Sequence, residues 1–242
     1  MLRHLGTKRT NKHNIKLASL LGLTAGFVNA AGFLAFSVLT TNVTGHAALF
    51  AERIAQQDWK TARVVALWMC LFLAGAFVSS LIISRIGKNQ RFSYVIPILI
   101  EIAILTSVAG FGYKYNGSLV AKEVFAGSLL FAMGLQNSLV SMISGSVVRT
   151  THLTGTFTDL GIELGQIFQK NQDKRILYSK IKLRSTIIFF FMTGALAGAY
   201  MFRYLNFYSF FIPVVLLIFA LLGDIFRIRI QHYYRILSHR MP

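Results

Sequence analysis

Long apolar stretches, separated by short polar and basic segments, dominate the pattern of this chain. There are six of them, at roughly residues 17–38, 63–84, 93–113, 119–143, 185–204 and 207–226. Each is close to the ~20 residues that a helix needs to cross the hydrocarbon of a bilayer. Backbone polar groups must be paired within that layer, and a helix pairs its own. The pattern therefore predicts an all-α, polytopic membrane bundle of six transmembrane helices.

The composition agrees with a membrane protein. Hydrophobic residues make up 55% of the chain and charged residues only 14%, against roughly 25% charged residues in an ordinary soluble domain. The mean hydropathy is +0.58, and a soluble core of this size could not bury so much apolar surface. The single cysteine, Cys70, lies inside an apolar stretch. We expect it to be a packing or lipid-facing residue, and it excludes a disulfide within the chain and a cysteine-based metal site.

The basic residues predict the orientation of the chain. Lysine and arginine total 25 against 8 acidic residues, a formal net charge of +17. In a soluble protein this excess would suggest nucleic acid, but here the charges lie between apolar stretches. With the N-terminus inside, 19 of the 25 fall on inner segments and 6 on outer ones. We therefore expect both termini in the cytoplasm and no nucleic-acid partner.

This topology divides the chain into three parts. A basic N-terminal segment covers residues 1–16, the membrane domain covers 17–226, and a basic tail covers 227–242. The tail, "RIRIQHYYRILSHR" from position 227, combines cations with aromatic residues. Attachment to anionic lipid headgroups suits this mixture better than nucleic acid does.

Two similar polar phrases, "TTNVTG" at 40–45 and "TTHLTG" at 150–155, each follow an apolar stretch. We call residues 40–45 the first phrase and residues 150–155 the second phrase. Other features recur around them in the same order: an asparagine upstream (Asn29 and Asn137), a small-residue segment downstream (73–80 and 192–199), and then a proline (Pro97 and Pro213). The order predicts a duplicated three-span unit, about 17–113 and 119–226. Because three is odd, the second copy must enter the membrane from the opposite side, and such inverted repeats recur in secondary transporters.

The two phrases could also start helices. Threonine is a common N-cap residue. We expect Thr41 or Thr44 to start a short helix over about 45–56, and Thr151 or Thr154 to start one over 155–169. If these helices begin within the membrane, their N-termini present free N–H groups and positive dipole ends that suit an anion or a carboxylate. His46, His152 and Asp159 would add titratable groups. The alternative is that both phrases are helix caps at interfacial turns, each with a glycine for conformation.

Polar residues within the apolar stretches leave further alternatives open. Asn29, Gln136 and Asn137 would line a solute site or form hydrogen bonds between helices. Glu101 would carry a coupling proton or pair with a nearby lysine or arginine. Glu52 and Glu163 follow the two phrases, and for both we favour an ion pair, with Arg53 or a loop lysine, over cation binding.

The segments "GFVNAAGF…LTTNVTGH" and "GLQNSLVS…VVRTTHLTGTFTDLG" resemble the YoaK-like bacterial membrane proteins (domain of unknown function 1275). The resemblance covers about residues 17–226. It implies a bacterial plasma-membrane protein with about six helices, and it implies no activity. The positions that carry it are Asn29, Thr41, Asn42, Thr44, Gly45, His46, Gln136, Asn137, Thr151, His152, Thr154, Gly155 and Thr156.

Taken together, these features predict a bacterial inner-membrane transporter of a small solute, with an anionic solute as one candidate. The predicted solute-binding residues are Asn29, Thr41, Asn42, Thr44, Gly45, His46, Gln136, Asn137, Thr151, His152, Thr154, Gly155, Thr156 and Asp159, and Glu101 is the proton-coupling candidate. The alternatives are a non-transporting membrane scaffold or assembly protein and, third, an intramembrane enzyme. Sequence motifs of nucleophile elbows, zinc proteases, phosphate loops and dinucleotide sites are absent, so we expect no enzyme, no metal and no cofactor. The spacings "GLTAG" (22–26) and "GALAG" (194–198) predict close helix packing and leave a homodimer open.

Overall fold

The computed structural model describes residues 10–87, 93–169 and 173–223. Within these ranges the regular structure is entirely helical. The elements are α1 (Asn11–Phe36), α2 (Val43–Ala55), α3 (Trp59–Ile86), α4 (Val95–Phe111), η2 (Gly112–Lys114), α5 (Leu119–Ser144), α6 (Leu153–Gln166), α7 (Lys174–Leu205) and η3 (Asn206–Phe210). A last helical segment covers 211–223. The basic tail 227–242 and the first nine residues of the predicted N-terminal segment lie outside the described residues.

Five stretches are long and apolar enough to cross a membrane. They are Asn11–Phe36, Trp59–Ile86, Val95–Lys114, Leu119–Ser144 and Lys174–Gly223. Each of the first four overlaps one of the predicted apolar stretches over nearly its whole length. The fifth is 50 residues long, more than twice the ~20 residues of one span, and the 3-10 turn η3 interrupts it. Two predicted stretches, 185–204 and 207–226, fall in it, although 224–226 lie outside the described residues.

Three of the long helices, α1, α3 and α7, begin earlier than the apolar stretches predict. α1 starts at Asn11 instead of residue 17, and α7 starts at Lys174 instead of residue 185. The added turns carry basic residues, among them Lys12, Lys16, Lys174 and Arg175, which is typical of helix ends at the headgroup level. Acidic N-caps define two helix starts. Asp58 accepts a hydrogen bond from the backbone N–H of Thr61 at the start of α3, and Asp173 accepts one from the backbone N–H of Arg175 at the start of α7.

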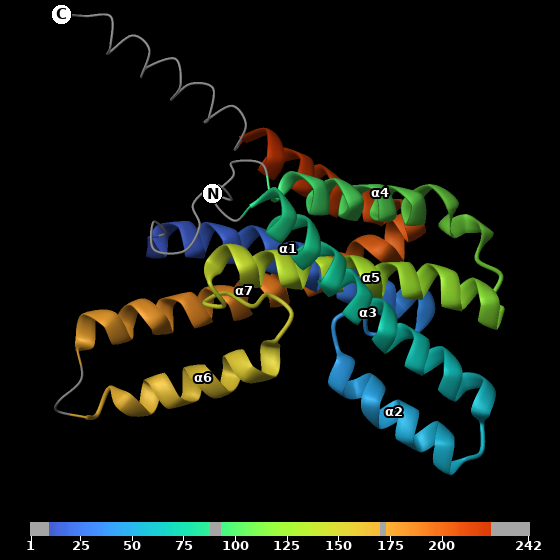
Figure 1. Ribbon diagram of the computed structural model, residues 1–242, viewed down its shortest axis with the longest axis horizontal. Helices are drawn as coiled ribbons and strands as arrows, with labels where there is room; N and C mark the ends of the chain where they lie inside the picture. The colour runs from blue at the N-terminus through green and yellow to red at the C-terminus, as the bar shows by residue number, and fades with distance from the viewer. Residues whose placement is uncertain (1–9, 88–92, 170–172, 224–242) are drawn as a thin grey trace, which may run out of the picture.

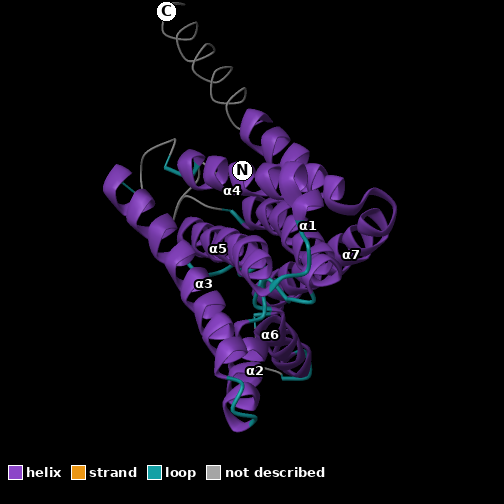
Figure 2. Ribbon diagram, turned by 90° about the vertical axis from the view of Figure 1, so that its right-hand side faces the viewer, coloured by secondary structure: helices purple, strands orange, loops and turns teal. Residues whose placement is uncertain are grey.

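The long helices lie roughly parallel to one axis in two opposite directions (Figure 1). α1, α4 and α7 run one way, and α3, α5 and the segment 211–223 run the other way. α1 packs along α7, and α3 packs along α5. The two short helices, α2 and α6, lie on one side of these long helices (Figures 1 and 2). Both begin near the middle of the molecule and run toward opposite ends, α2 against α3 and α6 against α7.

Glycines allow the closest helix contacts. A Cβ atom at Gly26 of α1 would lie closer than 3.0 Å to the carbonyl oxygen of Phe191 in α7, and one at Gly194 of α7 would be as close to the carbonyl oxygen of Leu23. We call this contact the α1–α7 crossing. Small residues let backbones approach closely in membranes, where burial against lipid provides little driving force. The spacings that contain Gly26 and Gly194 therefore act in packing, as the sequence predicts.

A matching contact joins the other pair, and we call it the α3–α5 crossing. A Cβ atom at Gly75 of α3 would lie closer than 3.0 Å to the carbonyl oxygen of Phe131 in α5. One at Gly134 of α5 would be as close to the carbonyl oxygen of Phe72. Two pairs of long helices, α1 with α7 and α3 with α5, therefore pack with their backbones in close contact.

Large apolar side chains cover the outer surface of the long helices. Leu73, Phe77, Phe189, Leu196 and Phe219 are each more than half exposed. A soluble monomer rarely exposes so much apolar area, whereas lipid solvates it without cost. Cys70 is also exposed, on α3. This surface is that of a membrane protein.

Candidate solute site at the two phrases

The first phrase links α1 to the start of α2. Thr40 is fully buried, and the backbone N–H of Thr41 donates to Oδ1 of Asn29 over 3.1 Å. Asn42 is the N-cap of α2, because its Oδ1 accepts a hydrogen bond from the backbone N–H of Gly45 over 2.9 Å. Asn29 therefore holds the phrase against α1, and Asn42 starts the short helix.

Gln136 of α5 links the second phrase to α1. Thr150 is fully buried. The Nε2 amide group of Gln136 donates to the carbonyl oxygen of Leu21 in α1 over 3.0 Å and lies 3.5 Å from Oγ1 of Thr150. His152 occupies the N-cap position of α6, and its carbonyl oxygen accepts a hydrogen bond from the hydroxyl of Thr156 over 2.9 Å.

The glycine of each phrase leaves room for the capping side chain. A Cβ atom at Gly45 would lie 2.8 Å from Nδ2 of Asn42. A Cβ atom at Gly155 would lie closer than 3.0 Å to the ring of His152. In both phrases the capping side chain folds over the first turn, so a larger residue at either glycine would displace that side chain. Neither glycine has a positive φ angle.

The two phrases reach the same helix. The first is bonded to Asn29 of α1 and the second, through Gln136, to Leu21 of α1. These positions are eight residues apart, which is about 12 Å of helix at 1.5 Å per residue. In Figure 1 the starts of α2 and α6 approach the middle of the molecule from opposite ends. Each start is a helix N-terminus with a positive dipole end. The Asn42 side chain caps α2, whereas α6 has no side-chain cap hydrogen bond.

Some phrase residues face outward and others are buried. Asn42, Thr44, His152 and Thr154 are exposed, whereas Thr41 and Thr156 are buried, and Thr151 and Gly155 are half-buried. The exposed set alternates along each phrase in the same way. The hydroxyls of Thr44 and Thr154 have no side-chain hydrogen bond among the residues that the structure describes, so they are free to contact a solute.

His46 lies buried under α2, with its ring 5.6 Å from the ring of Trp68 in α3. Its Nε2 is 2.8 Å from the carbonyl oxygen of Leu39. A carbonyl can only accept, so Nε2 carries the proton and donates. α2 is not one of the membrane-spanning stretches. Burial lowers the pKa of His46 from its usual value of 6.5, and the hydrogen bond to Leu39 opposes this in part.

The pKa of His46 predicts acid sensitivity. Because its folded-state pKa lies below the unfolded value, the unfolded chain binds the extra proton, so stability is lost as the pH falls below about 6.5. We expect the melting temperature of the purified protein to be lower at about pH 5.5 than at about pH 7.5. His46→Gln keeps an Nε2–H donor near Leu39 but does not titrate, and should reduce this difference. An unchanged pH dependence in His46→Gln would assign it to other groups.

Asp159 and Glu163 of α6 bind one arginine of α7. Oδ2 of Asp159 is 3.1 Å from Nη2 of Arg184, and Oε1 of Glu163 is 3.6 Å from its Nε. Nη1 of Arg184 also donates to the carbonyl oxygen of Val147 over 3.2 Å. Glu52 lies 3.8 Å from Arg53, the predicted partner. Glu163 is ion-paired as predicted, but with Arg184 of α7 and not with Arg53 or a loop lysine. Asp159, predicted to bind solute, fixes α6 to α7.

Glu101 has the least usual environment. It is fully buried in α4, and neither carboxylate oxygen has a hydrogen-bond partner among the residues that the structure describes. Among the described residues, no lysine or arginine pairs with Glu101. Oδ1 of Asn137 and Oε1 of Gln136 are also buried and unpaired there. In the described residues, no group of three or more His, Cys, Asp or Glu side chains could hold a metal ion.

Two contacts were not predicted from the sequence. The sequence identifies Arg184 only as an inner-side cation, and it does not distinguish Trp68 from other apolar residues. Asp159 and Glu163 are four residues apart, which puts both carboxylates on one helix face, and this spacing signals a shared cation. The sequence carries no comparable signal for the contact between Trp68 and His46.

Comparison with known proteins gives the family. The profile described as "Protein of unknown function (DUF1275)" matches residues 17–223, which is most of the chain. The chain belongs to the DUF1275 family. All predicted site residues of this DUF1275 protein lie within the matched region. A curated relative, the UPF0700 transmembrane protein YoaK of Bacillus subtilis (strain 168), is 29% identical over 205 residues, covering 83% of this chain and 89% of the relative.

No solved structure matches the chain. The transmembrane relative and the apolar helices agree, so this DUF1275 protein is a multi-pass membrane protein. Its family label adds no activity, and the function must be argued from the arrangement of its own residues.

Proposed function

We propose that this protein is a secondary transporter in a bacterial plasma membrane. It carries a small solute, with an anion as the favoured class, through a site between two inverted three-helix repeats. Each repeat is a long helix, a short half-helix and two further long helices: α1 to α4, and α5 to the segment 211–223. The turn η3 divides the last apolar stretch into two spans, which gives six spans with both termini in the cytoplasm.

The observation that carries the proposal is the correspondence between the two helix crossings. Gly134 follows Gly26 by 108 positions, and Phe191 follows Phe72 by 119 positions. Gly26 meets the carbonyl oxygen of Phe191, and Gly134 meets that of Phe72. The repeat offsets inferred from sequence are 108 for the asparagines and 119 for the small-residue segments. By these offsets Gly26 corresponds to Gly134, and Phe72 corresponds to Phe191. The contact between Gly26 and Phe191 is therefore equivalent to the contact between Gly134 and Phe72.

The second pair of contacts follows the same rule. Gly194 follows Gly75 by 119 positions, and Phe131 follows Leu23 by 108. Gly75 meets the carbonyl oxygen of Phe131, and Gly194 meets that of Leu23. α1 and α5, the first helices of the two repeats, also run in opposite directions (Figure 1). These relations support a two-fold relation within the membrane plane, which is the ground plan of many secondary transporters.

The short helices supply the solute site. In transporters of this plan, half-helix N-termini point at anionic groups near the midplane. Here Thr44 and Thr154 occupy equivalent, exposed positions in the first turns of α2 and α6. Their hydroxyls and the first-turn N–H groups are donors, which favours a solute with acceptor oxygens. Asn42 and His152 flank them.

Glu101 is the proposed proton carrier. A carboxyl group that is buried in a spanning helix without a cation is costly to ionise. It would be retained where protonation and release are part of a cycle. The position related to it by the repeat is Leu217, also buried, so coupling would reside in one half only.

Solute flux into proteoliposomes tests the proposal. Osmotic swelling would be followed by light scattering, with acetate, lactate, chloride and glycerol as the probes. At least one probe should enter faster than in protein-free vesicles. Thr44→Ala/Thr154→Ala should lower that rate roughly ten- to thirtyfold, because two hydrogen bonds of about 1 kcal/mol each are lost. Glu101→Gln should remove acceleration by an imposed pH gradient while downhill flux persists.

Thr186→Ala is the matched control. The hydroxyl of Thr186 bonds to the carbonyl of Lys182 on an exposed face of α7, so its loss should leave flux unchanged. If every probe enters at the protein-free rate, the proposal fails and the scaffold alternative gains. An equal rate in wild type and Thr44→Ala/Thr154→Ala would place the solute path elsewhere.

A further inference from the structure

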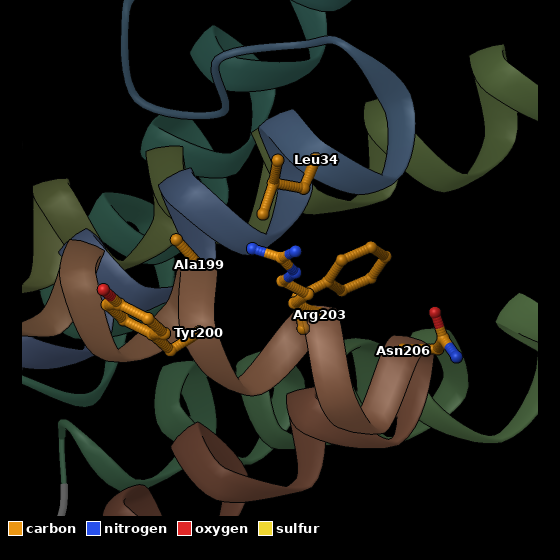
Figure 3. Close-up of a pocket in the computed structure, with 6 residues that line it drawn as sticks. Leu34, Ala199, Tyr200, Arg203 and Asn206 are labelled. Atoms are coloured by element: carbon orange, nitrogen blue, oxygen red, sulfur yellow. The ribbon is translucent and has the colours of Figure 1, made fainter.

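A surface cavity lies where the end of α7 meets the end of α1 (Figure 3). Its volume is about 550 Å³, and it is lined by Leu34, Ala199, Tyr200, Phe202, Arg203 and Asn206. Leu34 comes from α1, and the others come from α7 and the start of η3. Ala199 and Arg203 are four residues apart, so they share one face of α7, and Asn206 directly follows the end of that helix.

Arg203 supplies the charge of this cavity. In Figure 3 its guanidinium extends toward Leu34 and Ala199, with Tyr200 to one side and Asn206 to the other. Arg203 has no acidic partner among residues 10–87, 93–169 and 173–223. A guanidinium has five donors and binds phosphate with two parallel hydrogen bonds. Tyr200 and Asn206 line opposite sides of the cavity and carry further hydrogen-bonding groups at its edges.

The cavity lies at the level of the membrane interface. Tyr113, Tyr200, Tyr204 and Tyr208 are all exposed at this end of the molecule, where α4 and η3 pack together. Tyrosines gather at the headgroup level, where one end of the ring is apolar and the other is wet. The opposite end of α7 begins with Lys174 and four further cations within eleven residues, so the apolar middle of α7 spans the hydrocarbon.

We propose that this cavity binds the headgroup of an anionic phospholipid, in the outer leaflet under the topology above. The phosphate lies against Arg203, and the glycerol hydroxyls of a phosphatidylglycerol-type headgroup contact Tyr200 and Asn206. The acyl chains leave along Leu34 and Phe202, which line the apolar side. A choline headgroup would bring a quaternary cation next to the guanidinium and bind less well. This site is separate from the solute site at the two phrases.

Native mass spectrometry of the purified full chain tests the proposal. The protein in detergent would be titrated with phosphatidylglycerol, phosphatidylcholine or glycerol phosphate. We expect one phosphatidylglycerol to bind in preference to phosphatidylcholine. Arg203→Gln should weaken it about tenfold, the loss of one charge-assisted interaction. Glycerol phosphate should not displace it, because the soluble headgroup lacks the apolar contacts.

Two further variants make the result specific. Ala199→Phe fills the cavity and leaves Arg203 intact, so it should weaken phosphatidylglycerol as much as Arg203→Gln does. Lys114→Gln removes another cation at the same end, one that lies over the Phe111 ring, and should leave binding unchanged. The proposal is overturned if Arg203→Gln and Ala199→Phe keep the preference, if Lys114→Gln loses it equally, or if glycerol phosphate competes as well as the lipid.

Discussion

Replacing Gly26 or Gly134 by alanine is expected to destroy most of the folded protein, although each change adds only one methyl group. The new Cβ atom would lie closer than 3.0 Å to a backbone carbonyl oxygen, that of Phe191 or of Phe72. A side chain could rotate away, but a backbone carbonyl in a helix cannot. The two helices would have to separate along the whole crossing. We expect a loss of about 3 kcal/mol or more, the upper range for overpacked cores, visible as a lower yield of monodisperse protein and a lower melting temperature.

Gly110→Ala is the matched control for these two changes. Gly110 also lies within a long helix, but a Cβ atom there would meet nothing within 4 Å. Alanine favours helix over glycine by up to about 1 kcal/mol, so this variant should be neutral or stabilised. Gly26→Ala and Gly134→Ala should also lose similar amounts, because the proposed repeats relate them. Wild-type behaviour of either would show that its crossing is looser than described.

The helices of this protein could be predicted well from the sequence, and their ends less well. A hydropathy pattern reports the part of a helix that lies in hydrocarbon. It does not report the polar turns that extend into the headgroups, such as the start of α7 at Lys174. The acidic caps Asp58 and Asp173 precede those polar turns in the sequence. An acidic residue before a helix is a start signal. Asp58 marks the start of α3 at Trp59, and Asp173 marks the start of α7 at Lys174.

Packing partners could not be predicted in the same way. The spacing around Gly26 indicates that some helix approaches α1 closely, but not that it is α7, about 160 residues later, instead of the next span. Which face of a short helix is buried likewise depends on which long helix packs against it. His46 and Asp159 were therefore assigned to a solute site from their residue types, whereas the structure places His46 against Trp68 and Asp159 against Arg184. Both phrases do cap helices, but the caps are Asn42 and His152. The threonines that the sequence favours as caps are therefore the wrong residues, because several neighbouring polar side chains in each phrase could fill that position.

Arg184→Ala is expected to release α6 from α7. The guanidinium contacts Asp159, Glu163 and the carbonyl of Val147. The Glu163 side chain is only 9% exposed, so its carboxylate would be left buried without a cation. Such a loss costs about 3–5 kcal/mol in a fully buried site, and we expect about 2–3 kcal/mol here because Arg184 and Asp159 are partly exposed. Thermal unfolding measures the loss, and faster amide hydrogen exchange across 153–166 would locate it in α6.

The double variant Arg184→Ala/Glu163→Gln separates lost attraction from a stranded charge. If the buried carboxylate causes most of the cost, removing its charge should restore more than half of the stability, and the two effects should be strongly non-additive. Lys182→Ala, an exposed cation two residues away on α7, should change neither stability nor exchange. Since α6 carries Thr154 into the proposed site, Arg184→Ala should also slow solute flux, and the double variant should recover it. Additive losses, or fast exchange in α6 with normal flux, would mean that this bridge does not position the second phrase.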